Sequence, residues 1–183
     1  MEEYAYVLDY LPQGAPNGNY ERREPLCYAL GETEFKLFEL VAKPKAVINF
    51  EDRVYLGKDP AQRAVIDHVK RRVGYDDLTS TAQAELDYAI ADIVKANEAR
   101  FVRFYNEAGP ISMRKHLLEE LPGLGKKSMQ AILDDRTKNG SFRSFADITA
   151  RVPVVKNPEK LIAARISLEI TDPARKRYLF VSR

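Results

Sequence analysis

The sequence is poor in the residues that form disulfides or hold metal ions. Its 183 residues include one cysteine and two histidines. A single cysteine cannot form an internal disulfide, and because Cys27 lies in an apolar stretch we expect a buried, unreactive thiol. His68 and His116 have no second Cys or His at ligand spacing, which argues against structural zinc. We therefore expect no metal site.

Long apolar runs and common catalytic motifs are also missing. No apolar run approaches the roughly 20 residues that a membrane span needs. The chain starts with Met-Glu-Glu-Tyr, which is acidic where a signal peptide would be basic. It contains no Walker A loop, no Gly-x-Ser-x-Gly and no His-Glu-x-x-His. These absences predict a cytoplasmic protein with no membrane partner, no catalytic residues and no cofactor.

Charge is unevenly distributed along the chain. Hydrophobic residues make up 45% and charged residues 31%, which is typical of a globular protein with a net charge here of +2. Residues 110–183 contain 15 Lys and Arg against 8 Asp and Glu, a net charge of +7. The first 109 residues therefore carry a net charge of −5. A basic C-terminal part favours nucleic acid as a partner of that part.

The first third of the chain has the patterns of β-strands. Residues 3–11 alternate large apolar side chains on one face, as in a half-buried strand. A loop is expected over residues 12–24, where Asn17-Gly18 is a turn signal. Five short strands with tight turns predict a small barrel over residues 1–58, of the OB or S1 type or of another small-barrel type. The four later strands are expected at residues 26–30, 35–42, 46–50 and 53–56.

Residues 59–110 are predicted to form an α-helical connector. One helix is expected over residues 61–72, before Gly74. Ser80 and Gln83 have the spacing of a capping box for a second helix. Apolar residues at steps of three and four extend that helix to Ala108. A third helix is expected from Ser112 to about residue 120.

The segment Leu121-Pro122-Gly123-Leu124-Gly125-Lys126-Lys127-Ser128 carries the strongest functional signal. It resembles the turn of the helix-hairpin-helix motif, in which an apolar residue, Pro, Gly, an apolar residue and Gly precede a basic residue. Pro ends the first helix, and glycines permit positive φ and close approach of a ligand. The second helix would start near Lys126 with unpaired amides, which form an anion site suited to a phosphate. The alternative is a helical turn that binds nothing.

A looser second hairpin is expected downstream. Ser144 predicts the cap of a short helix, and Val152-Pro153-Val154-Val155-Lys156-Asn157 resembles the first turn with its glycines lost. The second turn therefore either binds a phosphate or only packs. Residues 111–183 are predicted to be a helix-hairpin-helix domain, which makes the fold class α+β: barrel, connector and hairpins. Four downstream cations widen the expected contact: Arg143, Lys156, Lys160 and Arg165.

The run Phe104-Tyr105-Asn106-Glu107-Ala108-Gly109-Pro110-Ile111-Ser112, followed by the hairpin, resembles an uncharacterised archaeal protein family described as predicted RNA-binding. The resemblance covers nearly the whole chain and implies an S1- or OB-like barrel and a C-terminal helix-hairpin-helix. It favours RNA over DNA and a link to ribosomal RNA or translation. We expect a non-catalytic protein that contacts phosphates through Pro122, Gly123, Leu124, Gly125, Lys126, Lys127, Ser128, Arg143, Lys156 and Lys160.

Two other functions compete with this hypothesis. Some DNA glycosylases carry the same hairpin, followed by a Schiff-base lysine where Lys127 lies. Such enzymes also need a catalytic aspartate at a set distance, and Asp147 is about two residues away from that place. The third hypothesis is an adaptor whose acidic barrel binds a protein partner while the hairpins bind RNA.

Overall fold

The computed structural model describes residues 1–15 and 23–183, which divide into two compact units. Unit 1 contains Met1–Ala89 and Glu169–Arg183, and unit 2 contains Ile90–Leu168. The expected turn at Asn17-Gly18 lies outside the described residues. In the part of the chain that is described, no helix combines the length and hydropathy that a bilayer crossing requires.

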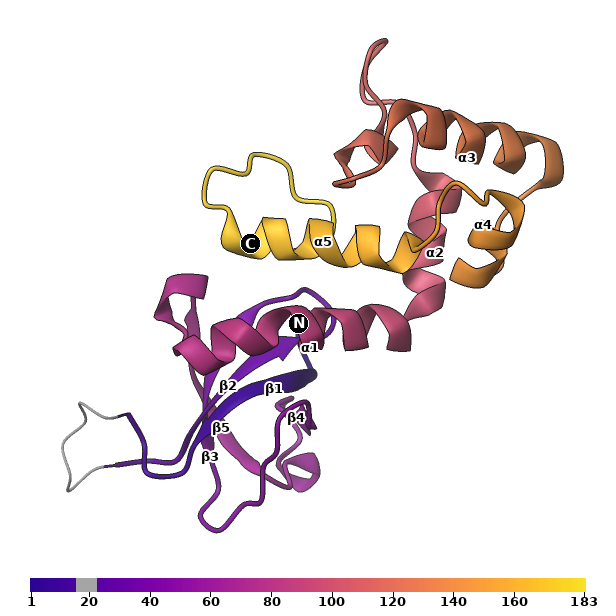
Figure 1. Cartoon of the computed structure of the whole chain (residues 1–183). Coiled ribbons are helices and arrows are strands. Elements are labelled where there is room, and N and C mark those ends of the chain that lie inside the picture. Colours follow the sequence, from indigo (N-terminus) through magenta and orange to yellow (C-terminus); the bar gives the residue numbers. More distant parts are fainter. Residues whose placement is uncertain (16–22) are drawn as a thin grey trace. The chain divides into compact units, whose positions relative to one another are not determined.

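Unit 1 is built on one antiparallel sheet of five strands that curls into a half-barrel (Figure 1). The strand order is β4-β1-β2-β3-β5, so β4 and β5 are the two edges. The sheet and the helices of unit 2 together confirm the α+β class. The strands are β1 (Tyr4–Leu11), β2 (Leu26–Gly31), β3 (Leu37–Ala42), β4 (Arg53–Tyr55) and β5 (Ile66–Val73).

The concave face of the sheet holds an apolar cluster. Alternating residues of neighbouring strands meet there, including Val7 of β1, Ala29 of β2 and Leu40 of β3, all fully buried. Cys27 lies in the same cluster. Burial raises the pKa of its thiol to about 12, with smaller contributions from Asp9 and Asp52. The thiol is therefore protonated and buried, as the sequence predicted.

Two of the predictions for the first 72 residues are wrong: the helix over residues 61–72 and the strand over residues 46–50. Residues 61–72 do not form a helix: a 3₁₀ turn, η2 (Pro60–Gln62), is followed by β5, which pairs with β3. Its β-branched residues favour a strand, and its exposed cations suit an edge. Residues 46–50 form a loop, because the chain turns at Lys45 and Glu51 with positive φ. The fifth strand thus comes from the expected connector.

The predicted long helix is two helices, α1 (Ser80–Ala96) and α2 (Glu98–Glu107). Asn97 interrupts it with φ −120° and ψ 40°, and its side-chain amide donates to the carbonyl of Ile93. The cap of α1 is Thr79 and not Ser80, because the Thr79 hydroxyl accepts the amide of Ala82. Gln83 is not part of a capping box, since its side chain donates to the carbonyl of Tyr75.

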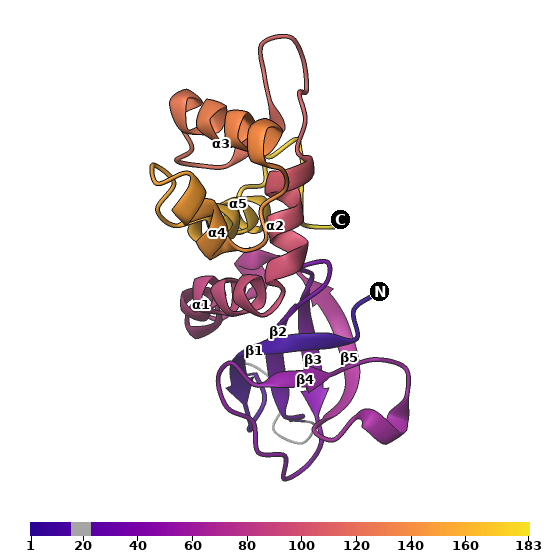
Figure 2. The same ribbon diagram turned by 90° about the vertical axis from the view of Figure 1, so that its right-hand side faces the viewer.

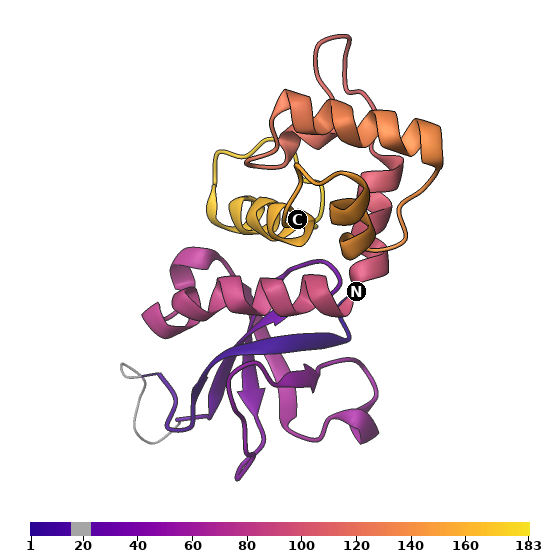
Figure 3. The same ribbon diagram turned by 45° about the vertical axis from the view of Figure 1, so that its right-hand side comes forward.

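Residues 112–120 also differ from the expected helix. The chain after α2 forms a loop that projects from unit 2 at the top of Figure 3. Pro110 and His116 form a bridge across the base of this loop. Only the 3₁₀ helix η4 (Leu117–Glu120) is helical in this segment.

Helix α2 lies beside the other helices of unit 2, which are α3 (Lys126–Asn139), α4 (Phe145–Arg151) and α5 (Pro158–Thr171) (Figure 2). Arg136 of α3 donates to the carbonyls of Tyr105 and Ala108 at 3.0 and 2.9 Å. The Tyr105 hydroxyl donates to the carbonyl of Pro158 at 2.6 Å. The carboxylate of Glu98 accepts the amide of Phe145 at 2.7 Å. Polar groups of α2 therefore fix the three later helices.

Thr79 connects α1 to the sheet within unit 1. Its hydroxyl donates to the Asp9 carboxylate at 2.6 Å and accepts the amide of Ala82 at 3.1 Å. We expect Thr79→Ala to lower the free energy of unfolding by about 1–3 kcal/mol, since it removes a helix cap and leaves a buried carboxylate short of a donor. Urea denaturation measures the change. Thr79→Ser keeps the hydroxyl and should retain most of the stability; an equal decrease in both variants would contradict the assignment.

Candidate functional site

The turn that leads into α3 contains two glycines, which differ in backbone conformation and in surroundings. Gly123 has φ +89°, a region that favours glycine, and a Cβ there would lie 3.4 Å from a methyl group of Leu161. Gly125 has φ −75° and ψ 166°, which any residue adopts, and open space surrounds it. Only Gly123 therefore needs glycine for its conformation, whereas Gly125 leaves the start of α3 uncovered.

The first turn of α3 presents backbone amides without acceptors. The first backbone bond of the helix is donated by Met129 to the carbonyl of Gly125 at 2.9 Å. Among the described residues, no hydrogen bond engages the amides of Lys126, Lys127 or Ser128, and no acidic side chain lies in this turn. Both lysines are exposed. These amides and the positive end of the helix dipole favour an anion.

The apolar residues of this turn pack it against the rest of unit 2. Leu121 and Leu124 are buried, as their apolar positions predict, and the amide of Leu124 donates to the carbonyl of Leu121 at 3.2 Å. Pro122 is half-buried between them. The two buried leucines thus anchor the turn, while Gly123 and Gly125 remain exposed.

A second turn joins α4 to α5. Ser144 caps α4 through its hydroxyl, which accepts the amide of Asp147 at 2.9 Å, as predicted. Val152 and Val155 are buried, and the amide of Val155 donates to the carbonyl of Val152 at 3.0 Å. Lys156, the next residue, is exposed. A tight turn therefore forms here without glycine, because the buried valines anchor it.

The two turns line one cavity of about 270 Å³. Lys156 and Lys160 are its cations, and none of its lining residues is acidic. Pro122, Lys126, Lys127 and Arg143 lie outside the lining. The residues that line the cavity are Gly123, Leu124, Ser128, Val154, Val155, Lys156, Asn157, Lys160 and Leu161.

Four of these residues were not expected from the sequence, and one of them is the buried Val155. Val154 is a large apolar side chain with 63% exposure, and Asn157 and Leu161 stand at the start of α5. Asn157 accepts the amide of Lys160 through its carbonyl at 3.1 Å. The signal for Asn157 was available, because Asn before Pro is typical of a helix start. The exposed Val154 had no such signal.

A buried ion pair fixes α5 against η4, the segment before the first turn. Arg165 is 1% exposed, and its guanidinium donates to the carbonyl and the carboxylate of Glu120 at 3.1 and 3.0 Å. Lys115 also contacts this carboxylate at 2.8 Å and, as the largest cause, lowers the pKa of Glu120. Arg165 was expected to widen the contact surface. Its burial makes that expectation wrong, because its guanidinium is engaged in holding α5 against η4.

The remaining candidate residues lie apart from the cavity lining. The amide of Arg143 donates to the Asp147 carboxylate at 2.9 Å, and Arg151 contacts the same carboxylate at 3.3 Å. The bond from the Arg143 amide is the largest cause that lowers the pKa of Asp147. Asp147 therefore serves the start of α4 as an ionised acceptor. In the described residues, no three His, Cys, Asp or Glu side chains are placed to hold a metal ion.

Comparison with known proteins finds relatives over the full length. Residues 1–182 match the family model described as "Protein of unknown function (DUF655)". The uncharacterized protein MJ0038 of Methanocaldococcus jannaschii is 46% identical over 182 residues, which cover 99% of this chain and 80% of that protein. The crystal structure of Af1531 from Archaeoglobus fulgidus matches with a TM-score of 0.90 and 45% identity, covering 99% of this chain and 100% of the other.

The two glycines should respond differently to substitution. Gly123→Ala forces a side chain into positive φ, so we expect the free energy of unfolding to fall by about 1–2 kcal/mol. Gly125→Ser places an acceptor at the cap of α3 in an ordinary backbone conformation, so we expect no decrease in the free energy of unfolding. Urea denaturation of both variants tests the difference. Equal decreases would show that the positive φ of Gly123 is not what the turn requires.

His116 should make the stability depend on pH. It is buried, and its Nδ1 accepts the amide of Leu118 at 3.0 Å, which requires a neutral ring. Burial first, and then Arg136, hold its pKa below the usual value of about 6.5. A depressed histidine pKa stabilises the fold above the unfolded pKa, and this stability is lost as the pH falls.

We therefore expect the free energy of unfolding to decrease between pH 7 and pH 5, and to decrease less in His116→Asn. Asn keeps an acceptor at the cap and cannot be protonated in this range. Urea denaturation at both pH values compares the two proteins. A decrease of the same size in the variant would exclude His116 as its cause.

Proposed function

The chain belongs to the DUF655 family of proteins of unknown function, and we propose that its two turns in unit 2 bind the phosphate backbone of nucleic acid without catalysis. The observation that carries the proposal is the uncapped start of α3 beside a cavity lined by both turns. Free amides, the helix dipole and nearby lysines together are the usual means of binding a phosphate.

In the proposed function, the two turns are tandem helix-hairpin-helix elements. The first supplies the amides of Lys126, Lys127 and Ser128, which would donate hydrogen bonds to the oxygens of one phosphate. The second supplies side-chain charge from Lys156 and Lys160, which line the same cavity. The second turn then contributes to binding despite its lost glycines, because lysine ammonium groups replace backbone donors.

The ligand of the proposal is RNA in preference to DNA, as the sequence resemblance implies, with a role linked to ribosomal RNA or translation. The half-barrel of unit 1 would then be an S1- or OB-like domain on the same chain. Contacts from backbone amides and lysines reach phosphates and not base edges, so binding is independent of sequence. Such complexes have dissociation constants of roughly 10⁻⁴–10⁻⁶ M at physiological salt.

Arg143 and the two lysines of α3 widen the proposed contact. Lys126 and Lys127 are exposed beside the free amides, and Arg143 is exposed before α4. Pro122 and Leu124 shape and anchor the turn, so their role is to position the amides. An acidic side chain at this end of α3 would oppose the ligand, and the first turn of α3 contains none.

Removal of the two lysines should weaken binding and reduce its dependence on salt. We expect Lys126→Gln with Lys127→Gln to flatten the slope of log K against log salt concentration. The slope should change by about 0.7 for each phosphate of a single strand that the variant no longer neutralises, and by about 0.9 for each phosphate of a duplex. Fluorescence anisotropy with short RNA and DNA, single- and double-stranded, at several salt concentrations measures this.

The matched control is Lys138→Gln, which removes an exposed lysine from the last turn of the same helix. It should leave both the affinity and the salt slope close to the wild-type values. If the double variant and the wild type bind every probe equally, or if neither binds any probe, the proposed function is wrong.

A further inference from the structure

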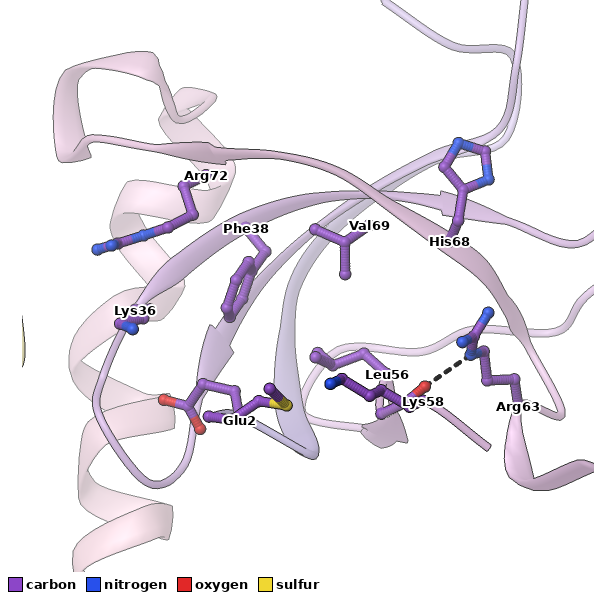
Figure 4. Close-up of a pocket in the computed structure, with 11 residues that line it drawn as sticks. Glu2, Lys36, Phe38, Leu56, Lys58, Arg63, His68, Val69 and Arg72 are labelled. Atoms are coloured by element: carbon purple, nitrogen blue, oxygen red, sulfur yellow. Dashed lines mark hydrogen bonds between the residues drawn. The ribbon is translucent and has the colours of Figure 1, made fainter. Parts of the chain in front are cut away.

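Unit 1 has its own cavity, of about 360 Å³, at the open side of the half-barrel (Figure 4). We call it the seam pocket, because its lining comes from β3, from the edge strand β5 and from the residues that follow the other edge strand, β4. Its volume lies in the range of about 300–1,000 Å³ that is usual for small-molecule sites.

The floor of the seam pocket is apolar. Phe38 and Val69 project into it from β3 and β5, opposite Leu56, which follows β4 (Figure 4). Phe38 belongs to the core cluster of the half-barrel, whereas Val69 is 37% exposed. An inward-facing valine of a filled barrel would be covered by other side chains. Its exposure shows that the space beside it is open.

A register shift brings a cation onto the same face. In the pairing of β3 with β5, Phe38 is opposite Arg72 and Leu40 is opposite Val69, with an irregularity between Glu39 and Leu40. Residues opposite each other share a face, so Val69 and Arg72 both lie on the inner face although they are three residues apart. An arginine thus stands on the inner face of the half-barrel, at the cavity.

Four cations line the seam pocket, and they differ in how they are engaged. Lys36 pairs with Glu34 at 2.6 Å. Arg63 donates to the carbonyls of Gly57 and Asp67 at 2.7 and 3.1 Å. In the part of the chain that the structure describes, the side chains of Lys58 and Arg72 form no ion pair and no hydrogen bond. These two are the cations with free capacity for an anionic ligand.

The acid in the lining forms no ion pair with these two cations. Glu2 is buried, and its carboxylate oxygens accept the amides of Thr33 and Glu34 at 2.9 and 2.6 Å. This carboxylate closes the turn between β2 and β3. The carboxylate oxygens of Glu2 are thus directed toward that backbone, and the donors of Lys58 and Arg72 remain available to a ligand.

We propose that the seam pocket binds a nucleotide, with the phosphate on Lys58 and Arg72 and the base against the floor of Phe38, Leu56 and Val69. Several cations around one cavity match the two negative charges of a phosphate monoester better than the single charge of a carboxylate. The apolar floor adds a surface for a flat base. The same chemistry is offered by a free nucleotide and by one unit of a single-stranded nucleic acid.

Titration calorimetry with three probes distinguishes these sources: adenosine 5′-monophosphate, hexaadenylate RNA and octanoate. The wild type should bind the monophosphate, the hexamer or both, and Lys58→Gln with Arg72→Gln should reduce that affinity about tenfold or more, since two charged donors are removed. Both side chains are exposed, so the variant should fold. Lys70→Gln, on β5 but outside the lining, is the matched control and should bind as the wild type does.

Binding of the monophosphate identifies a free nucleotide, and binding of the hexamer alone identifies a strand. The variant Lys126→Gln with Lys127→Gln, altered only in unit 2, should bind the monophosphate normally. The inference is overturned if the wild type binds neither nucleotide probe, if it binds only octanoate, or if the seam-pocket variant binds unchanged. Hexamer affinity that depends only on Lys126 and Lys127 would overturn the seam pocket and leave the proposed function of the two turns intact.

Discussion

A guanidinium buried to 1% exposure must find acceptors, because an unpaired buried charge costs several kcal/mol. Arg165 of α5 finds two acceptors on Glu120, a residue of η4 that directly precedes the first turn. This requirement fixes α5 against the segment that leads into α3. As a consequence, Lys160 near the start of α5 and Gly123 in the first turn line the same cavity. The geometry of the candidate site thus depends on an ion pair that does not itself line it.

The turns before α3 and α5 are built from different residues and leave different numbers of backbone amides without acceptors. The first uses Gly123 at positive φ and leaves the amides at the start of α3 without acceptors. The second has no glycine, and Asn157 accepts the amide of Lys160 within the chain itself. Fewer donors therefore remain at the start of α5, and its contribution to an anion site comes from the lysine side chains. The first turn thus offers backbone donors to the cavity, and the second turn offers lysine ammonium groups.

Local patterns in the sequence were sufficient for β1 to β4 and for the turn before α3, because alternation and the Pro-Gly-x-Gly spacing act over a few residues. They failed where a distant partner decides the structure. Residues 66–73 carry charges that suit an exposed helix equally well, and pairing with β3 makes them a strand. The break at Asn97 and the burial of Arg165 likewise depend on packing in unit 2. The cavity between the turns could not be predicted, since it requires the relative placement of η4 and α5.

Net charge does not describe the local charge at the half-barrel, for a related reason. The first 109 residues carry a net charge of −5, yet carboxylates act only over short distances when they are paired with cations. Glu32 pairs with Arg53 and Glu39 with Arg71, at 2.7 and 2.6 Å. Lys36, through its hydrogen bond, is the largest cause that lowers the pKa of Glu34 to about 2. These three acids are paired with neighbouring cations, so they contribute little net charge at a distance. In the lining of the seam pocket, Lys58 and Arg72 have no ion pair, and the carboxylate of Glu2 is directed toward the backbone amides of Thr33 and Glu34.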